Sequence, residues 1–323
     1  MDPRVGPLSS FESPRFAQPA TFMRLPHTRD LTGVDVAICG APYDGGASYR
    51  PGTRLAPREV RNQSSLIRTW SYFLKVHPFE RLRVVDYGDF DVPPIGIERA
   101  FEVIEAGASA IHDAGATPLV VGGDHSISLP LLRAAAKKHG PLALVQFDSH
   151  IDTWDEYFGG KYFHGSPFIR AIEEGLIRKD RFVQVGIRGP MYGEDEFDFH
   201  RAHGIRVVDI DGVKREGIDW TIDQIRGVMD DGPVYLTFDI DSVDPAYAPG
   251  TGTPEVGGLT SHEAQRLVRG LAGLNIVGAD LVEVSPPFDG PGQITSLLAA
   301  NLLFEMLCVL AVRRNSTRLN FPG

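Results

Sequence analysis

Cysteine, basic clusters and long apolar segments are all scarce in this chain of 323 residues. Its two cysteines, Cys39 and Cys308, lie far apart in apolar runs, which indicates reduced core residues and not functional thiols. The net charge is −10 and no block of lysine and arginine stands out, which argues against nucleic acid as a partner and is compatible with cationic ligands.

Targeting and membrane signals are scarce as well. No apolar run reaches the ~18 residues that a membrane span needs, so we expect no membrane partner. The N-terminus lacks the basic region followed by an apolar region that marks a secretory signal. These features predict a cytoplasmic enzyme or binding protein.

Residues 1–30 are rich in proline and lack periodicity, which predicts an extended N-terminal arm. Residues 31–323 show neither an internal repeat nor a linker, so we expect them to form a single domain.

About eight strand–helix units follow the arm. Short β-branched runs, predicted as strands, alternate with amphipathic stretches, predicted as helices. The expected strands lie at 34–42, 81–90, 117–123, 141–148, 181–189, 205–211, 233–241 and 276–287. Nearly continuous apolar strands predict a parallel sheet covered by helices on both faces. An open α/β/α sandwich and a closed eight-fold barrel both fit this rhythm, and both place ligands at the carboxyl ends of strands.

The stretch "FDSHIDTW", residues 147–154, carries Asp148, His150 and Asp152 at alternate positions after an apolar run. In an extended chain these three side chains share one face, with Ser149 and Ile151 on the other. Three such groups on one face repel one another unless a cation lies between them. A polar turn rich in aspartate is the competing interpretation.

Three more clusters stand at expected strand ends. Asp239 and Asp241 repeat the alternate spacing after "YLTF", and two buried carboxylates need a counter-charge. His125 follows "GGD" and opens the next expected helix. Glu283 interrupts the apolar strand "LVEVSPP", where an unpaired charge is costly. A helix cap for His125 and turn chemistry for the aspartates are the alternatives.

The first three clusters together supply six metal-ligating groups: His125, Asp148, His150, Asp152, Asp239 and Asp241. Six ligands exceed what a single tetrahedral zinc with an open position uses, but they suffice for two metals that share carboxylates. Carboxylate and imidazole together suit Mn²⁺ best, with Zn²⁺, Fe²⁺ and Ni²⁺ not excluded.

The motifs "GGDHS", "FDSHIDT" and "FDIDSVDPAYAPGTGTPEVGGLT" resemble the three signatures of the ureohydrolases, the arginase and agmatinase superfamily. "VEVSPPFD", "AANLLFEMLC" and the arm from Pro14 to Pro26 look like the agmatinase branch. The resemblance covers essentially the whole chain. It implies a three-layer α/β/α sandwich with an eight-stranded, mostly parallel sheet, two Mn²⁺ per subunit, and hydrolysis of a guanidino group to urea and an amine. It also implies a homo-oligomer, a trimer or hexamer, in which the arm packs on a neighbour.

The resemblance implies catalytic roles for Asp152, His164 and Glu283. Asp152 accepts a hydrogen bond from the attacking hydroxide while it binds metal. His164, in "KYFHGSPF", moves protons. Glu283 binds the guanidinium as a bidentate fork, with an ion pair to Arg188 as its alternative.

Three further residues near these motifs carry expectations. Trp154 departs from the family pattern, and we expect either a pocket wall that binds substrate or plain loop packing. Asp124 is expected to be a structural cap. Ser149 is expected to have little effect, because it points away from the ligands.

The substrate is expected to be a small guanidino compound. The loop at 154–163 lacks the polar run that reads the amino-acid end of arginine. Asp155 and Glu156 suit the cationic tail of agmatine, which we favour, whereas Lys161 and Arg188 suit a guanidino acid such as 4-guanidinobutyrate or 3-guanidinopropionate. A deacetylase-like zinc hydrolase and a non-catalytic ureohydrolase-like subunit are the alternatives of other classes, and the complete ligand set argues against both.

Overall fold

The computed structural model describes residues 6–193 and 195–313, so the ends of the predicted arm and domain, 1–5 and 314–323, lie outside the described residues. The described residues hold eight strands: β1 Val36–Ala41, β2 Val84–Asp89, β3 Thr117–Gly122, β4 Leu142–Phe147, β5 Ile177–Ile187, β6 Arg206–Asp209, β7 Val234–Asp239 and β8 Ile276–Val282. Each falls within or overlaps a stretch expected from the apolar runs. The predicted alternation of strands and helices is therefore confirmed.

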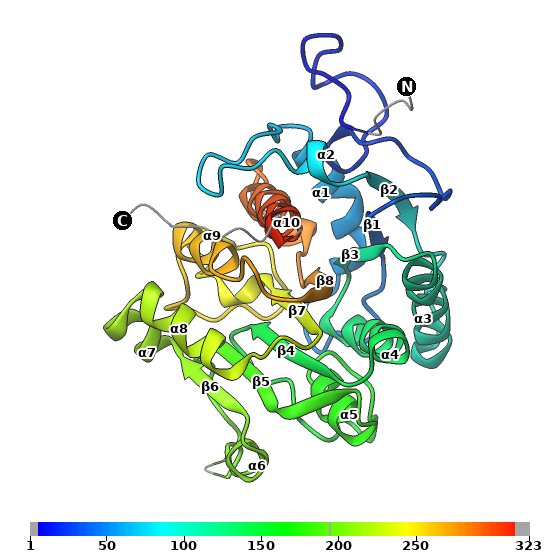
Figure 1. Ribbon diagram of the computed structural model, residues 1–323. Coiled ribbons are helices and arrows are strands. Elements are labelled where there is room, and N and C mark those ends of the chain that lie inside the picture. Colours follow the sequence, from blue (N-terminus) through cyan, green and yellow to red (C-terminus); the bar gives the residue numbers. More distant parts are fainter. Residues whose placement is uncertain (1–5, 194, 314–323) are drawn as a thin grey trace.

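All strands join one parallel sheet in the order β2-β1-β3-β8-β7-β4-β5-β6 (Figure 1). The sheet is open, since β2 and β6 are its two edges and do not pair with each other. This decides between the two architectures that the sequence left open, in favour of the sandwich.

Helices cover both faces of the sheet (Figure 1). They are α1 Ala56–Ser64, α2 Pro78–Arg81, α3 Ile97–Asp113, α4 Ser128–His139, α5 Pro167–Glu173, α6 Asp198–His203, α7 Ile210–Glu216, α8 Ile218–Val228, α9 Ser261–Arg269 and α10 Ile294–Arg313. In β1, Val36 and Ile38 belong to the apolar core that includes residues of α1 and α8–α10, whereas Ala37 and Cys39 belong to the core that includes residues of α3–α5. This alternation gives the sheet a separate apolar core on each face.

Helix α10 corrects the expectation about apolar run length. Its segment Ile294–Val312 has 19 residues and a mean hydropathy of 2.0, which meets the length and composition of a membrane span. However, 83% of that segment is buried inside the protein, and its residues form much of the core beside α1 and α9. Burial by other elements explains its apolar character.

The expected end of the strand at 205–211 is wrong. The run at 205–211 was expected to be strand throughout, but β6 ends at Asp209 and α7 begins at Ile210. Asp209 caps α7, since its carboxylate accepts a hydrogen bond from the backbone N–H of Gly212 at 2.7 Å. The helix cap formed by Asp209 thus outweighs the preference of the β-branched run for a strand.

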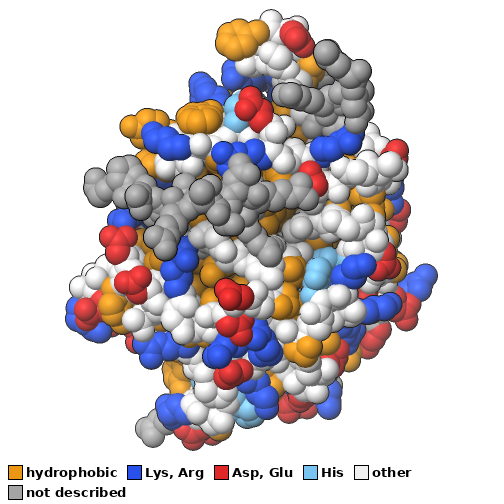
Figure 2. All heavy atoms as spheres, in the orientation of Figure 1, with side chains coloured by type: hydrophobic (Ala, Val, Ile, Leu, Met, Phe, Trp, Pro, Cys, Tyr) orange, Lys and Arg blue, Asp and Glu red, His pale blue; other side chains and the backbone are white. Residues whose placement is uncertain are grey.

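The later part of the N-terminal arm, around Phe22, is hydrogen-bonded to the sheet. The carboxylate of Asp86 in β2 accepts the backbone N–H of Phe22 at 2.8 Å, and Arg61 of α1 pairs with the same carboxylate at 2.9 Å. Phe11 and Phe16 earlier in the arm are almost fully exposed. On the face seen in Figure 2, basic and acidic side chains are interspersed and do not gather by sign.

Candidate metal centre

The predicted site residues lie at or just after the carboxyl ends of four neighbouring strands. The sheet order places β3, β8, β7 and β4 side by side, and their carboxyl ends lead directly into His125, Glu283, Asp239 and Asp148. Because parallel strands end on one edge of the sheet, clusters far apart in sequence converge there. Glu283 lies just past the end of β8 and not within the strand as expected.

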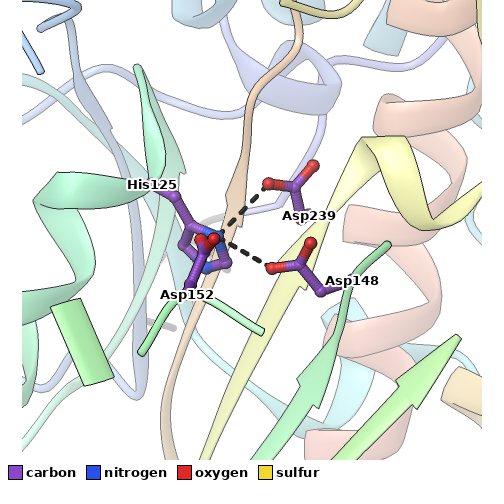
Figure 3. Close-up of side chains that lie close together, drawn as sticks. All are labelled: His125, Asp148, Asp152 and Asp239. Atoms are coloured by element: carbon purple, nitrogen blue, oxygen red, sulfur yellow. Dashed lines mark ion pairs between the residues drawn. The ribbon is translucent and has the colours of Figure 1, made fainter. Parts of the chain in front are cut away.

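The first group surrounds the imidazole of His125 (Figure 3). Its Nδ1 lies 2.8 Å from Asp152, 3.1 Å from Asp148 and 3.2 Å from Asp239. All four side chains are buried, and their ligand atoms lie within 4.8 Å of one another. Asp152 reaches this group by adopting a left-handed backbone (φ 49°). The chain also bends at residues 149 and 150, directly after β4, so it does not continue in the extended form that we expected.

The second group adjoins the first through a shared carboxylate. Nδ1 of His150 lies 3.0 Å from Asp241 and 3.6 Å from the other oxygen of Asp148. Asp148, His150 and Asp241 thus form a second set of three ligand atoms within 4.8 Å. The six predicted ligands come together as two sets, with Asp148 belonging to both.

Electrostatics at these groups reflect crowded negative charge. Burial, followed by the neighbours Asp241 and Asp148, raises the pKa of Asp239 well above its usual range. Burial and Asp148 raise the pKa of Asp152 to about 6. Burial opposes a charged His125, but its contacts with Asp148, Asp152 and Asp239 outweigh burial and raise its pKa well above the usual value. The negative charge of these carboxylates also attracts a divalent cation to the space between them.

The donor set fits metal ions. Nδ1 of His125 is buried without a hydrogen-bond partner and faces three carboxylates. Four carboxylates and two imidazoles would hold divalent metal ions through mixed oxygen and nitrogen ligands, and Asp148 would serve both positions.

Glu283 and His164 lie next to the first group. Nδ1 of His164 is 3.0 Å from Oε1 of Glu283, which also accepts the backbone N–H of His125 at 2.8 Å. The other oxygen, Oε2, is buried without a partner. Burial lowers the pKa of His164, but the hydrogen bond to Glu283 outweighs it and raises the pKa to about 9.

Trp154 lies beside the second group. Its ring centroid is 6.4 Å from that of His150 and 5.9 Å from that of Tyr192. Nε1 donates to Glu196 at 2.5 Å, and Glu196 also accepts the backbone N–H of Tyr192. Trp154 thereby joins the loop at 154–163 to the segment that holds Tyr192 and Glu196.

Two alternatives from the sequence are resolved by contacts. Arg188 donates to the backbone carbonyls of residues 186, 241, 242, 255 and 256 and does not pair with Glu283. Asp124 caps the turn His125–Ile127, as expected, and also accepts the N–H of Gly46 at 2.7 Å.

The direction expected for the Ser149 side chain is wrong. Its Oγ donates to Asp241 at 2.8 Å and its backbone N–H donates to the same oxygen at 3.1 Å. The bend after β4 turns Ser149 toward the second group, which strict alternation did not allow for.

Sequence reasoning missed further polar residues around the site, four of which matter most. Ser48 contacts Nε2 of His164 at 2.7 Å, and Glu255 lies 3.8 Å from Nε2 of His150. Thr237 and Asp280 lie behind His125. The last two interrupt apolar strands, which is the same signal that drew attention to Glu283.

Comparison with known proteins agrees with this geometry. A family model described as the arginase family matches residues 34–308.

The chain belongs to the arginase family. It is 50% identical over 306 residues to guanidinopropionase of Pseudomonas aeruginosa, covering 94% of this chain and 96% of that protein. It is 46% identical over 290 residues to a mitochondrial agmatinase of Gallus gallus, covering 90% and 85%. The solved structure of proclavaminate amidinohydrolase from Streptomyces clavuligerus has a TM-score of 0.89 at 44% identity and covers 93% of this chain and 100% of that one.

The similarity to these relatives shows that this arginase-family protein is an enzyme that hydrolyses guanidino compounds. The three-layer α/β/α fold and the ureohydrolase resemblance are confirmed, with the sheet parallel throughout. The family depends on two metal ions, and the two groups of His and Asp side chains provide for them.

Proposed function

We propose that the protein binds two Mn²⁺ ions and hydrolyses a guanidino substrate to urea and an amine. His125, Asp148, Asp152 and Asp239 hold one ion, and Asp148, His150 and Asp241 hold the other. The observation that supports this most is the unpartnered, buried Oε2 of Glu283 beside the two groups. A guanidinium N–H can donate a hydrogen bond to this buried oxygen, which otherwise lacks a donor.

The contacts of Glu283 refine the expected role. Its Oε1 already accepts from His164 and from the backbone of His125, so we propose that the guanidinium is held through Oε2 and not by a symmetric fork. The substrate cation then lies between Glu283 and the metal groups.

His164 is the proposed proton donor. With a pKa of about 9, its ring carries a proton at neutral pH and can transfer it to the departing amine. Glu283 orients the ring through Nδ1, and Ser48 contacts Nε2. Two divalent ions, when bound, supply the Lewis acidity that makes water nucleophilic near neutral pH.

For the tail, we propose a guanidino acid such as 3-guanidinopropionate or 4-guanidinobutyrate. The case for agmatine relied partly on Asp155, but that carboxylate pairs with the buried Arg170. Arg50 and Lys161 have no carboxylate partner among the described residues, and Arg50 lies over the rings of Tyr49 and Phe288 at 5.5 and 5.1 Å. The name of the relative at 50% identity agrees with an acidic tail.

Agmatine stays the second candidate. Glu156 is exposed in the same loop, and Glu255 is only partly buried beside His150. Both acids suit a terminal ammonium. The 46% identical relative named agmatinase supports this candidate.

A panel assay tests these proposals. The Mn²⁺-loaded enzyme is given 3-guanidinopropionate, 4-guanidinobutyrate, agmatine and arginine, and urea is measured. We expect urea from at least one substrate, with the acids ahead of agmatine and arginine poorest. Absence of urea from all four contradicts the proposed reaction, whereas agmatine ahead of both acids contradicts only the proposed tail.

His164→Ala separates proton transfer from metal binding. We expect kcat to fall by roughly 10²–10⁴-fold while the metal content stays at the wild-type value, because His164 is not in either group. Loss of bound metal in this variant would show that His164 has been given the wrong role.

We also propose that the enzyme is a cytoplasmic homo-oligomer, a trimer or hexamer. Exposed Phe11 and Phe16 in the arm and Trp70, Tyr72 and Phe73 in the segment before α2 offer apolar surface for such contacts. Light scattering of the purified protein measures the number of chains, and a monomeric mass contradicts the proposal.

A further inference from the structure

A chain of buried hydrogen bonds runs behind His125, on the side opposite its three carboxylates. Nε2 of His125 lies 2.8 Å from Oγ1 of Thr237, and this hydroxyl donates to Oδ1 of Asp280 at 2.6 Å. None of the three residues is more than 1% exposed. Thr237 and Asp280 stand opposite each other in the register of β7 and β8, so the sheet itself holds them in contact.

The direction of these bonds follows from the partners of Asp280. Its other oxygen, Oδ2, accepts from the hydroxyls of Ser128 and Tyr235, each at 2.9 Å. An ionised carboxylate only accepts hydrogen bonds, so the Thr237 hydroxyl turns its proton toward Asp280 and presents a lone pair to His125. Nε2 of His125 then carries a ring proton, and Nδ1 is the nitrogen that would lose its proton to bind a metal ion.

We infer that Thr237 and Asp280 are positioning residues that hold His125 in the Nε2–H form and so present Nδ1 to one of the two metal ions. A ligating histidine needs its other ring nitrogen held in this way. Among the described residues, neither Thr237 nor Asp280 is hydrogen-bonded to His150 or Asp241, so their effect falls on one metal position. The inference rests on the two-metal site of the proposed function.

A purely structural role is the competing explanation, since the Thr237–Asp280 bond also ties β7 to β8. The two roles predict different outcomes for metal binding. A tie between strands affects folding and both metals alike, whereas a positioning role weakens one metal and leaves the other. Tyr235 offers a matched control, because it bonds the same carboxylate from the same strand but does not contact His125.

The experiment titrates Mn²⁺ into the full-length protein after a chelator has removed its metal. We expect the wild type to bind two ions per chain. In Thr237→Val, which keeps the side-chain shape, one ion binds about 10–100-fold more weakly, while the other stays within about threefold of the wild type. Thr237→Ser restores the hydroxyl and the affinity, and Tyr235→Phe binds both ions as the wild type does.

Electron paramagnetic resonance gives a second signature. At Mn²⁺ concentrations that fill both positions of the wild type, Thr237→Val shows the spectrum of an isolated Mn²⁺ ion, not that of a coupled pair. If Thr237→Val does not fold, Asp280→Asn serves in its place, because its amide donates toward Thr237 and reverses the chain of bonds.

Three results overturn the inference: Thr237→Val binds both ions with wild-type affinity, both ions weaken equally, or Tyr235→Phe weakens one ion as much as Thr237→Val does. None of these readouts uses a substrate. A failure of the urea assay therefore leaves this inference standing, and a failure here leaves the proposed reaction standing.

Discussion

At the scale of single residues, Ser149 shows how one side chain can orient a metal ligand. Its Oγ and its backbone N–H both donate to one oxygen of Asp241. Two donors on one oxygen orient the carboxylate toward His150. The residue therefore serves the second metal position in the way that Thr237 and Asp280 serve the first.

Ser149→Ala is expected to weaken the ion held by His150 and Asp241 roughly tenfold and to leave the ion at His125 unchanged. The backbone N–H of residue 149 still donates in the variant, so the carboxylate keeps part of its orientation. Titration with Mn²⁺ measures this, with Thr237→Val as the matched variant of opposite selectivity. Equal weakening of both ions contradicts this assignment.

His164 makes the stability of the fold depend on pH. Its pKa is raised from 6.5 to about 9 by Glu283, so between these values the folded protein keeps a proton that the unfolded chain has lost. The stabilisation is full below pH 6.5 and is lost as the pH rises through about 9. Compared with His164→Gln, we expect a wild-type advantage of up to roughly 3 kcal/mol at pH 6, shrinking by pH 10.

Thermal or urea unfolding of both proteins without metal measures this difference, because bound dications beside His164 would themselves lower its pKa. An advantage that grows with pH would contradict the proposed ion pair between His164 and Glu283.

At the scale of secondary-structure elements, the sequence carried most of the information about the site. Alternating Asp148 and His150 after an apolar strand and the pair Asp239 and Asp241 were enough to predict ligands at strand ends. Sheet order was beyond the sequence, because period-two patterns do not record which strands are neighbours. Only the structure places these strands side by side.

Backbone bends explain what else the sequence missed. Asp152 and Glu283 both have positive φ, at 49° and 63°, which is unfavourable for side chains other than glycine. No local sequence pattern predicts a positive φ at these two residues. The bend after β4 is what turned Ser149 toward Asp241, and so the expectation of a strictly extended chain failed there.

The close packing of the segment after β1 against the turn after β3 gives a prediction at this scale. A Cβ added at Gly123 would lie 1.6 Å from the backbone oxygen of Tyr43. Gly123→Ala is therefore expected to destabilise the fold by at least roughly 3 kcal/mol and to displace His125. Gly227→Ala in α8 is the matched control, because a Cβ there meets nothing within 4 Å.

Thermal unfolding compares the two variants. We expect a large drop in Tm for Gly123→Ala and an unchanged or slightly higher Tm for Gly227→Ala. Equal Tm values for both variants would show that the turn after β3 can move aside.

At the scale of the whole molecule, one edge of the sheet concentrates negative charge that the fold cannot neutralise by itself. Four buried carboxylates meet there with two histidines. Bound cations relieve their repulsion, so we expect metal to contribute substantially to stability.

Removal of metal by a chelator is expected to lower Tm, and addition of Mn²⁺ is expected to restore it. Asp239→Asn/Asp241→Asn, which removes two of the charges, should respond much less to the chelator. A wild-type Tm that is unaffected by the chelator contradicts a stabilising metal site.

Whether two bound ions make this protein a guanidino hydrolase is measured by counting metal and product together. Mn²⁺ is titrated into metal-free enzyme, and urea formation from 3-guanidinopropionate, 4-guanidinobutyrate and agmatine is measured at each step. We expect saturation at two ions per chain, with urea formation rising steeply as the second ion binds. Full activity with one ion or none, or no urea from any of these substrates at saturating Mn²⁺, would contradict this expectation.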